Sequence, residues 1–431
     1  MEETAENIVT PCQIKESEKS EMIKIFGVGG AGGNAVNNMF RLGIKGVNYV
    51  ICNTDTQALD DSPISRKIQL GKNRTAGLGA GNNPEVGRDS AVESEEEIRA
   101  ILEDNTRMVF VTAGMGGGTG TGAAPVIARM AKDMKILTAG IVSIPFKSEG
   151  RPRLRQAIKG VETMAKCVDS LLIINSQRLN DMYGDLPLST SFAKGDEVLA
   201  VAAKGLAEII SKHMTVNVDF ADVKTALTDS GCSLMGTGES TGENRAVEAV
   251  KKAMESPLLN NNNIRGATHI LFNVTSNPNK ELTQNELCAI MNYLYDQAGG
   301  EENEQNRIIW GAGVSEEIED DTLRVTVIAT GFATDCFEDN HPKKEVYVIP
   351  LKPESAEEKQ KKEVDKRSSL ELDSTDQIIH QLYNEVAESQ KESYDTRNLR
   401  DATSEPFNTL NDDKLNQIEN TPAFIRRGGS F

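Results

Sequence analysis

The chain has 431 residues, enough for two domains and a further unstructured segment, and its hydrophobic content of 38% is low for a chain that folds throughout. A formal net charge of -18 argues against nonspecific nucleic-acid binding, which usually needs a basic face. The N-terminus lacks a basic start with an apolar core, and no apolar run reaches the length of a membrane span. We therefore expect a cytoplasmic protein without direct membrane insertion.

The first predicted strand, 22–26, runs into a glycine-rich turn, 27–33, and then into a helix that ends near Gly43. Such a turn fits phosphate binding. Gly27, Gly29 and Gly32 also satisfy the G-x-G-x-x-G pattern of dinucleotide-binding folds. The next predicted strand, 47–52, is followed by Asp55, about where those folds hold the ribose. On this segment alone, a nicotinamide-dependent oxidoreductase is one hypothesis.

Residues 71–88 are predicted to form an irregular loop that is too glycine-rich for a plain linker. An exposed loop that contacts no ligand would leave these glycines unexplained, but this interpretation stays open.

A second glycine loop lies within 112–125, between a predicted strand at 108–111 and a helix at 123–134. Glycines there allow a ligand to approach the backbone, and the helix start offers unpaired N–H groups, so the pattern indicates a phosphate cradle. It is not a Walker A loop, because no Gly-Lys-Ser/Thr follows. Binding is expected to use backbone amides and the hydroxyls of Thr119 and Thr121. A merely flexible turn is the simpler interpretation.

Predicted strands at 108–111, 136–143 and 170–174 alternate with helices around 90–102, 123–134 and 152–166. This alternation predicts a parallel sheet with helices on both faces. Ligands of such sheets bind at the carboxyl ends of the strands, where both glycine loops fall.

A long helix, 192–214, is predicted to link two domains. Asp219 and Asp222 follow at the start of a short predicted helix, on one face, where two carboxylates can orient a water molecule. By themselves they are better explained as an N-cap aspartate followed by an acidic first turn of the helix. Helices at 243–254 and 283–298 and strands at 268–274, 307–314 and 323–330 predict a second, mixed α+β domain.

From about 340 to 417 the composition changes to charged and polar residues, which predicts a disordered linker. Close to the C-terminus, in 421–427, an apolar pair precedes two arginines. This end reads as a docking peptide or as a frayed terminus.

The run Gly116–Gly122 resembles the signature loop of the tubulin/FtsZ family of GTPases, and its flanks, 113–115 and 123–125, resemble the bacterial FtsZ branch. The resemblance covers roughly 22–335 and returns at the C-terminus. It implies an α/β fold with a Rossmann-like parallel-sheet GTPase domain, a long central helix, a second mixed α+β domain and a disordered C-terminal tail. The implied parts are 1–20 (N-terminal extension), 21–190 (GTP-binding domain), 191–214 (central helix), 215–338 (C-terminal domain), 339–417 (acidic linker) and 418–431 (docking peptide).

The resemblance implies GTP or GDP with Mg²⁺ as the bound cofactors. It assigns no metal ligand among the side chains, but places Asn53 and Asp55 near the γ-phosphate. The residues that it implies for GTP binding are Gly29, Gly30, Ala31, Gly32, Gly33, Asn34, Gly81, Met115, Gly116, Gly117, Gly118, Thr119, Gly120, Glu149, Arg153, Asn175, Phe192 and Asp196. For Phe192 the implied role is stacking on the guanine, and for Asp196 it is hydrogen bonding to the guanine edge. Glu149 and Arg153 are also four residues apart at a helix start, so a plain surface ion pair is the alternative.

Catalysis is implied to occur in trans. In the resembling proteins the loop that corresponds to Asn217, Asp219 and Asp222 acts on the nucleotide of the neighbouring subunit. The chain departs from the family pattern at Asn82, Ser148, Ser176 and His213-Met214.

The implied function is that of a cytoskeletal GTPase that polymerises head to tail into filaments of the cell-division ring, with hydrolysis driving disassembly. The implied partners are copies of the chain itself and membrane-anchoring and regulatory division proteins, with no nucleic acid. The division proteins would bind through Pro422, Phe424, Ile425, Arg426 and Arg427. Two alternatives remain: the oxidoreductase, and a nucleotide-binding scaffold that assembles without efficient hydrolysis.

Overall fold

Within the residues that the structure describes, ten strands form one sheet, in the order β3-β2-β1-β4-β5-β6-β7-β10-β8-β9. The computed structural model describes residues 21–44, 46–177, 188–211, 215–216, 218–256, 264–300, 306–316 and 318–332, without the side chains of 188–197 and 210–211. The predicted N-terminal extension, acidic linker and docking peptide lie outside the described residues.

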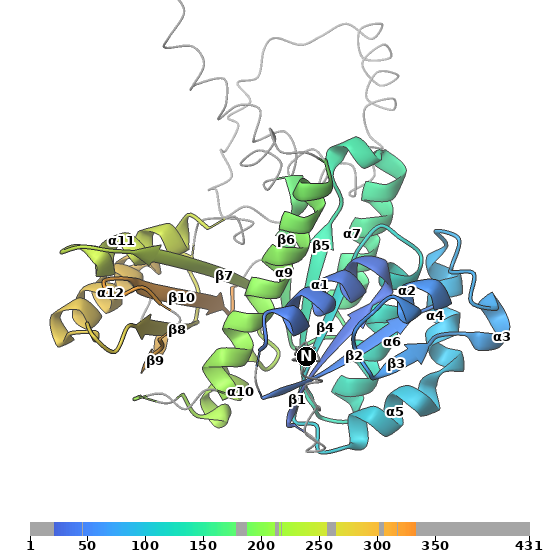
Figure 1. Ribbon diagram of the computed structural model, residues 1–431, viewed down its shortest axis with the longest axis horizontal. Helices are drawn as coiled ribbons and strands as arrows, with labels where there is room; N and C mark the ends of the chain where they lie inside the picture. The colour runs from blue at the N-terminus through green and yellow to red at the C-terminus, as the bar shows by residue number, and fades with distance from the viewer. Residues whose placement is uncertain are drawn as a thin grey trace, which may run out of the picture. The chain divides into compact units, whose positions relative to one another are not determined.

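The first six strands are parallel (Figure 1); the sequence predicted a parallel sheet and five of these strands, but not the short β3. They are almost fully buried, because helices cover both faces of a parallel sheet, and this explains their continuous apolar sequences. The strands are β1 (Ile23–Val28), β2 (Val47–Asn53), β3 (Lys67–Gln69), β4 (Met108–Gly114), β5 (Leu137–Ile144) and β6 (Ser170–Asn175).

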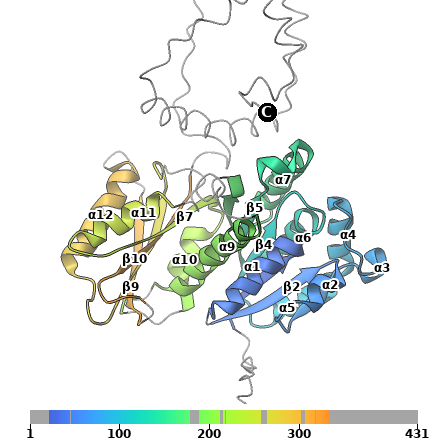
Figure 2. The same cartoon turned by 45° about the horizontal axis from the view of Figure 1, so that its top comes forward.

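Helices α1 (Gly29–Arg41) and α9 (Leu188–Ser211) pack side by side over one face of this parallel part (Figure 2). α9 buries an apolar face there that includes Leu199, Ala202 and Leu206. With 24 residues, α9 is about 36 Å long. The short α10 (Phe220–Leu227) follows it.

The remaining strands form the mixed part of the sheet that the sequence predicted: β7 (Gly231–Ser240), β8 (His269–Ser276), β9 (Arg307–Val314) and β10 (Leu323–Thr330). β10 is antiparallel to both of its neighbours, and β9 is parallel to β8. Helices α11 (Arg245–Met254) and α12 (Gln284–Gln297) bury a second hydrophobic cluster against these strands. The two parts join where β7 pairs with β6 over three residues.

The sequence analysis missed β7, although this strand connects the two parts. Its Gly236 and Gly238 weaken any strand signal, but α11 requires them. A Cβ atom at Gly236 would lie 1.9 Å from the carbonyl oxygen of Ala253, and one at Gly238 would lie 2.2 Å from that of Ala249. The glycines therefore mark a close approach of helix and strand rather than a turn.

The prediction of an irregular loop over 71–88 is wrong in part. The segment contains α3 (Lys72–Thr75), and α4 (Pro84–Glu93) begins within it. The Asn83 side chain caps α4 by accepting a hydrogen bond from the N–H of Glu85, and Pro84 occupies the first turn, where its missing N–H has no cost. The other helices are α2 (Thr56–Asp60), α5 (Glu95–Glu103), α6 (Thr119–Asp133) and α7 (Arg151–Ala165).

Candidate functional site

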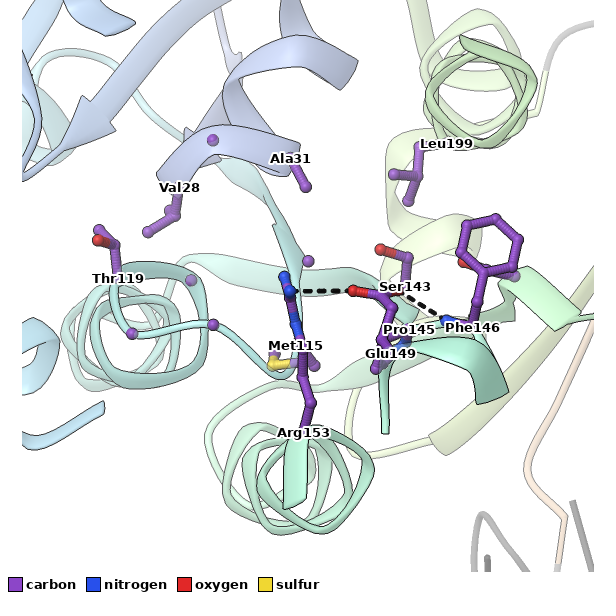
Figure 3. A pocket seen from close by; sticks show the side chains of 16 residues that line it. Val28, Ala31, Met115, Thr119, Ser143, Pro145, Phe146, Glu149, Arg153 and Leu199 are labelled. Atoms are coloured by element: carbon purple, nitrogen blue, oxygen red, sulfur yellow. Dashed lines mark hydrogen bonds and ion pairs between the residues drawn. The ribbon is translucent and has the colours of Figure 1, made fainter. Parts of the chain in front are cut away.

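A pocket of about 300 Å³ opens where the loops after β1, β4 and β5 meet (Figure 3). We call it the first pocket. It is lined by Val28, Gly30, Ala31, Gly114, Met115, Gly117, Gly118, Thr119, Gly120, Ser143, Pro145, Phe146, Glu149, Arg153, Ser176 and Leu199. A second pocket of about 310 Å³ shares Gly30 with it and also contains Gly29, Gly33, Asn34 and Asn53. Both lie at the carboxyl edge of the parallel strands, as predicted for a ligand of this fold.

The first glycine turn joins β1 directly to α1, which begins at Gly29. Gly32 packs inward, since a Cβ atom there would lie 2.3 Å from the carbonyl oxygen of Thr112 at the end of β4. Gly30 and Gly33, in contrast, have nothing within 4 Å of an added Cβ atom, and they line the pockets. The unpaired N–H groups at the start of α1 are therefore accessible to an anion.

Gln156 on α7 stabilises the second glycine loop by hydrogen bonds to its backbone. Its Nε2 donates hydrogen bonds to the carbonyl oxygens of Gly116 (3.1 Å) and Gly117 (3.0 Å). In a trans peptide the next N–H points the opposite way, so those of Gly117 and Gly118 are directed away from Gln156. Sequence reasoning missed Gln156, because no local pattern connects it to a loop 39 residues earlier in the chain.

The glycines of this loop serve two different purposes. Gly117 has nothing within 4 Å of an added Cβ atom and lines the first pocket. Gly118 and Gly122 pack on the segment that starts α4: a Cβ atom at Gly118 would lie 2.8 Å from the nitrogen of Asn83, and one at Gly122 would lie 1.9 Å from the oxygen of Pro84. Gly118 also lines the first pocket, whereas Gly122 does not. Only part of the glycine content therefore relates to a ligand.

The two threonines of the loop also differ. The hydroxyl oxygens of Thr119 and Thr54 are hydrogen-bonded at 2.7 Å, and Thr119 lines the first pocket. Thr121 is buried, and its hydroxyl accepts a hydrogen bond from the N–H of Gly116 at 2.9 Å. This hydroxyl shapes the loop from inside, whereas the sequence had suggested that it meets the ligand.

The segment before α4 lies against the same loop. Gly81 (φ +57°) and Asn82 (φ +60°) both adopt the left-handed conformation. Asparagine tolerates this conformation better than most residues, so the departure at Asn82 keeps the backbone path. Gly118 packs between Ala80 and Asn83, which places this segment directly beside the second glycine loop.

Glu149 and Arg153 form the ion pair that was the alternative interpretation, at 3.1 Å, and both line the first pocket (Figure 3). The other carboxylate oxygen of Glu149 accepts the N–H of Phe146 at 2.8 Å. Arg153 is 49% exposed, so it is free to swing toward a ligand. Phe146 and Ser143 line the pocket as well, and the sequence analysis did not single them out.

Asn53 and Asp55 follow β2 at the same edge. Asn53 is nearly buried and lines the second pocket, and its Oδ1 accepts the N–H of Asp55 at 3.4 Å. The carboxylate of Asp55 caps α2 through the N–H of Gln57 at 3.0 Å. Among the described residues no three His, Cys, Asp or Glu side chains are arranged to hold a metal ion.

The residues that the resemblance places near the base are Asn175, Phe192 and Asp196. Asn175 ends β6 and is 2% exposed, and its Oδ1 accepts the N–H of Gln177 at 3.0 Å. Its neighbour Ser176 lines the first pocket, but Asn175 does not. Phe192 and Asp196 belong to α9, and their side chains lie outside the described residues.

Asp219 and Asp222 lie in neither pocket. Asp219 precedes α10, Asp222 is in its first turn, and both are exposed. The turn after α10 meets the amino edge of the sheet, where the N–H of Gly231 donates to the carbonyl oxygen of Asp169, just before β6. In Figure 1, α10 is at the level where β1 begins. A strand of seven residues spans about 23 Å, which separates this edge from the glycine loops. Asn217 lies outside the described residues.

The parallel sheet, the two glycine-lined helix starts and the absence of a Walker lysine motif define the tubulin/FtsZ class of nucleotide-binding proteins. A family model for the tubulin/FtsZ GTPase domain matches residues 22–184, and one for the FtsZ C-terminal domain matches 231–333. The cell division protein FtsZ of Porphyromonas gingivalis is 49% identical over 315 residues, which cover 73% of this chain and 68% of that protein. The protein of the same name from Pseudomonas aeruginosa is 45% identical over 314 residues, or 73% and 78% of the two chains. Among solved structures, the empty FtsZ dimer of M. jannaschii is 41% identical and matches with a TM-score of 0.67 over 73% of this chain and 89% of that one.

The chain belongs to the FtsZ family of cell-division GTPases. It is therefore a GTPase that binds GTP and GDP, and the oxidoreductase hypothesis is wrong: the G-x-G-x-x-G match at Gly27, Gly29 and Gly32 belongs to a nucleotide-phosphate turn of another family. None of the described helices has the length and apolar character that crossing a bilayer requires.

Proposed function

We propose that this chain assembles head to tail with copies of itself when GTP is bound, and that GTP is hydrolysed only where two subunits meet. One observation carries the proposal: the exposed carboxylates of Asp219 and Asp222 lie outside both pockets, on a helix whose far end meets the opposite edge of the sheet. Among the described residues that line the first pocket, Glu149 is the one with a carboxylate, and it is paired with Arg153. The described part of that pocket thus offers backbone groups for phosphate binding, while its carboxylate is already engaged by Arg153.

The phosphates are bound by backbone N–H groups at the starts of α1 and α6, around Gly30 and around Gly117 to Gly120. Both helix dipoles favour the negative charge. Asp219 and Asp222 of the next subunit, together with Asn217, orient the attacking water toward the γ-phosphate. Loss of the γ-phosphate then weakens the contact between subunits, which links turnover to disassembly.

Mg²⁺ is the expected companion of the nucleotide. The oxygens of Asn53 and Asp55 suit a hard cation, and Asn53 lines the second pocket beside Gly33. Mg²⁺ held by these residues would neutralise charge that develops on the phosphates.

The base occupies the side of the first pocket near α9, where Leu199 and Ser176 form the wall. Phe192 would stack on the guanine and Asp196 would accept hydrogen bonds from its edge, with Asn175 contributing from the end of β6. Arg153 would contact the phosphates and Glu149 the sugar.

In the cell, the filaments are proposed to form the ring at the division site in the cytoplasm. The relatives named above are cell division proteins, and a solved relative is an FtsZ dimer. The terminal residues Pro422, Phe424, Ile425, Arg426 and Arg427 are proposed to bind membrane-anchoring and regulatory division proteins.

The testing experiment measures phosphate release per subunit, with GTP and Mg²⁺, across a range of protein concentrations. A specific rate near zero in dilute protein that rises above a threshold concentration is expected for a site shared between subunits. A specific rate that does not change with dilution would refute the in-trans role of Asp219 and Asp222. GTP-dependent filaments with almost no phosphate release would favour the scaffold alternative.

A further inference from the structure

A charged cluster at the amino edge of the sheet connects the helix that starts at the phosphates to the helix that carries Asp219 and Asp222. Its centre is Lys132, in the last turn of α6. Lys132 Nζ lies 2.9 Å from the carbonyl oxygen of Val168, 3.2 Å from Asp169 Oδ1 and 2.8 Å from Asp229 Oδ1. Three segments that are distant in sequence thus meet at one ammonium group.

Asp169 fixes the cluster to the sheet. Its side chain is 9% exposed, and its Oδ2 accepts the N–H of Thr138 at 2.9 Å, at the start of β5. Its backbone oxygen accepts the N–H of Gly231 at 3.1 Å and the hydroxyl of Ser230 at 3.4 Å. Asp169 therefore binds both the end of α6, through Lys132, and the turn that follows α10.

Asp229 lies in that turn, two residues after the end of α10. It holds a left-handed backbone conformation (φ +47°), which is uncommon for a residue other than glycine. Its side chain is 74% exposed, and its Oδ1 accepts a hydrogen bond from Lys132 Nζ.

Helix α10 has eight residues and is therefore a rigid rod about 12 Å long. On one side the buried hydroxyl of Thr330 on β10 donates to the carbonyl oxygen of Ala226 at 2.8 Å. At its end the cluster of Lys132 and Asp169 attaches the following turn to the first six strands. A shift of that turn would be transmitted along the rod to Asp219 and Asp222.

We infer that Lys132 is a positioning residue for catalysis: through Asp229 and Asp169 it sets where α10 presents Asp219 and Asp222 to the nucleotide of the neighbouring subunit. This inference rests on the proposed in-trans function. Because α6 begins in the phosphate loop and ends at Lys132, the same helix connects the subunit's own nucleotide with the carboxylates that serve the next one.

The charge on Lys132 persists at every physiological pH. Burial opposes the charge, but hydrogen bonds and ion pairs with Asp229 and Asp169 outweigh it and raise the pKa of Lys132 above its ordinary 10.5. A change of pH within that range therefore does not remove the charge of Lys132, and a substitution is needed to test the connection.

The experiment compares Lys132→Met, Lys132→Arg and Asp229→Asn with the control Lys251→Met, an exposed lysine on α11. For each full-length variant, GTP affinity is measured in dilute protein and phosphate release at saturating GTP above the assembly threshold. Lys132→Met is expected to bind GTP as the unaltered chain does and to release phosphate about tenfold more slowly, since displacements of an ångström at a catalytic group have effects of this order. Lys132→Arg should restore much of the rate. Asp229→Asn, which keeps the fold because the side chain is exposed, should lower the rate by a smaller factor.

Mixing with the unaltered chain separates positioning from general damage. If Lys132→Met affects only the carboxylates that its subunit donates, the rate rises in proportion to the fraction of unaltered subunits. If the substitution also damages the subunit's own pocket, the rate follows the square of that fraction.

A turnover equal to that of Lys251→Met, a parallel loss of GTP affinity, or a squared mixing curve would overturn the inference. Asp222→Ala, measured alongside, tells the two hypotheses apart: if Asp222→Ala retains full turnover, the in-trans function itself fails. If Asp222→Ala is inactive while Lys132→Met is fully active, only the role of Lys132 fails.

Discussion

The two edges of the parallel sheet are built on opposite principles. At the carboxyl edge the pockets are lined mainly by backbone, and helix starts provide the attraction for an anion. Before and within α10 the polar groups are the exposed carboxylates of Asp219 and Asp222, which line neither of the two pockets. In the proposed function, the first region binds the phosphates of the nucleotide and the second supplies the carboxylates that act on the nucleotide of the neighbouring subunit.

If the proposed function holds, each subunit contributes one half of an active site at the carboxyl edge and the other half at α10. Backbone binding tolerates little change in side-chain volume, because the loops pack closely on their neighbours. Exposed carboxylates tolerate substitution structurally, but they should be essential for turnover. The following predictions separate these two kinds of sensitivity.

The largest effect is expected at the carboxylates. Asp219→Ala and Asp222→Ala should each lower phosphate release above the assembly threshold by about 100-fold or more, as for the loss of a group that acts on the attacking water. Neither should change GTP affinity in dilute protein, because neither residue lines a pocket. Asp296→Ala, an exposed aspartate on α12, is the control for lost surface charge. A drop in GTP affinity equal to the drop in turnover would contradict the division between the two edges.

Two glycines of the same loop should respond in opposite ways. Gly122→Ala should destabilise the protein by about 1–3 kcal/mol, because its Cβ atom would lie 1.9 Å from the oxygen of Pro84 and the backbone must shift. Gly117→Ala meets nothing within 4 Å and should leave the unfolding temperature nearly unchanged, while its methyl group occupies the first pocket and weakens GTP binding. Thermal unfolding and nucleotide titration of both variants test this. Equal loss of stability in both would refute the assignment of Gly117 to the ligand and Gly122 to packing.

The sequence predicts the parallel part of the fold well, because its buried strands are continuous apolar runs and its helices are amphipathic. Prediction from the sequence fails where the role of a residue depends on a contact with a segment that is distant in the chain. The glycines of β7 are explained only by the close approach of α11, and the roles of Gly118 and Gly122 only by α4. Gln156 looks like an ordinary polar helix residue until the fold brings it under the second glycine loop. The glycine loops themselves could be recognised, because their glycines follow one another within a few residues of the sequence.

Arg153 should matter for the ligand and little for the fold. Its ion pair with Glu149 involves a side chain that is 49% exposed, so Arg153→Ala should change the free energy of unfolding by less than about 0.5 kcal/mol. If Arg153 turns to the phosphates in the complex, GTP affinity should fall about tenfold, the equivalent of about 1.4 kcal/mol for a charge-assisted hydrogen bond. Denaturant titration and nucleotide binding measure the two quantities. An unchanged affinity for GTP would mean that Arg153 only forms the ion pair with Glu149 and does not contact the ligand.

The smallest effect is expected at Gln156, which acts on the ligand only through the loop. Gln156→Leu keeps the side-chain volume but removes the donor to the carbonyl oxygens of Gly116 and Gly117. Since a partly exposed hydrogen bond contributes about 0.5–1.5 kcal/mol and water replaces part of it, GTP affinity should fall about fivefold. Gln297→Leu, at the exposed end of α12, is the matched control. If Gln156→Leu binds GTP like the control, the loop holds its N–H groups in place without support from α7, and the packing of Gly118 and Gly122 on α4 alone determines its shape.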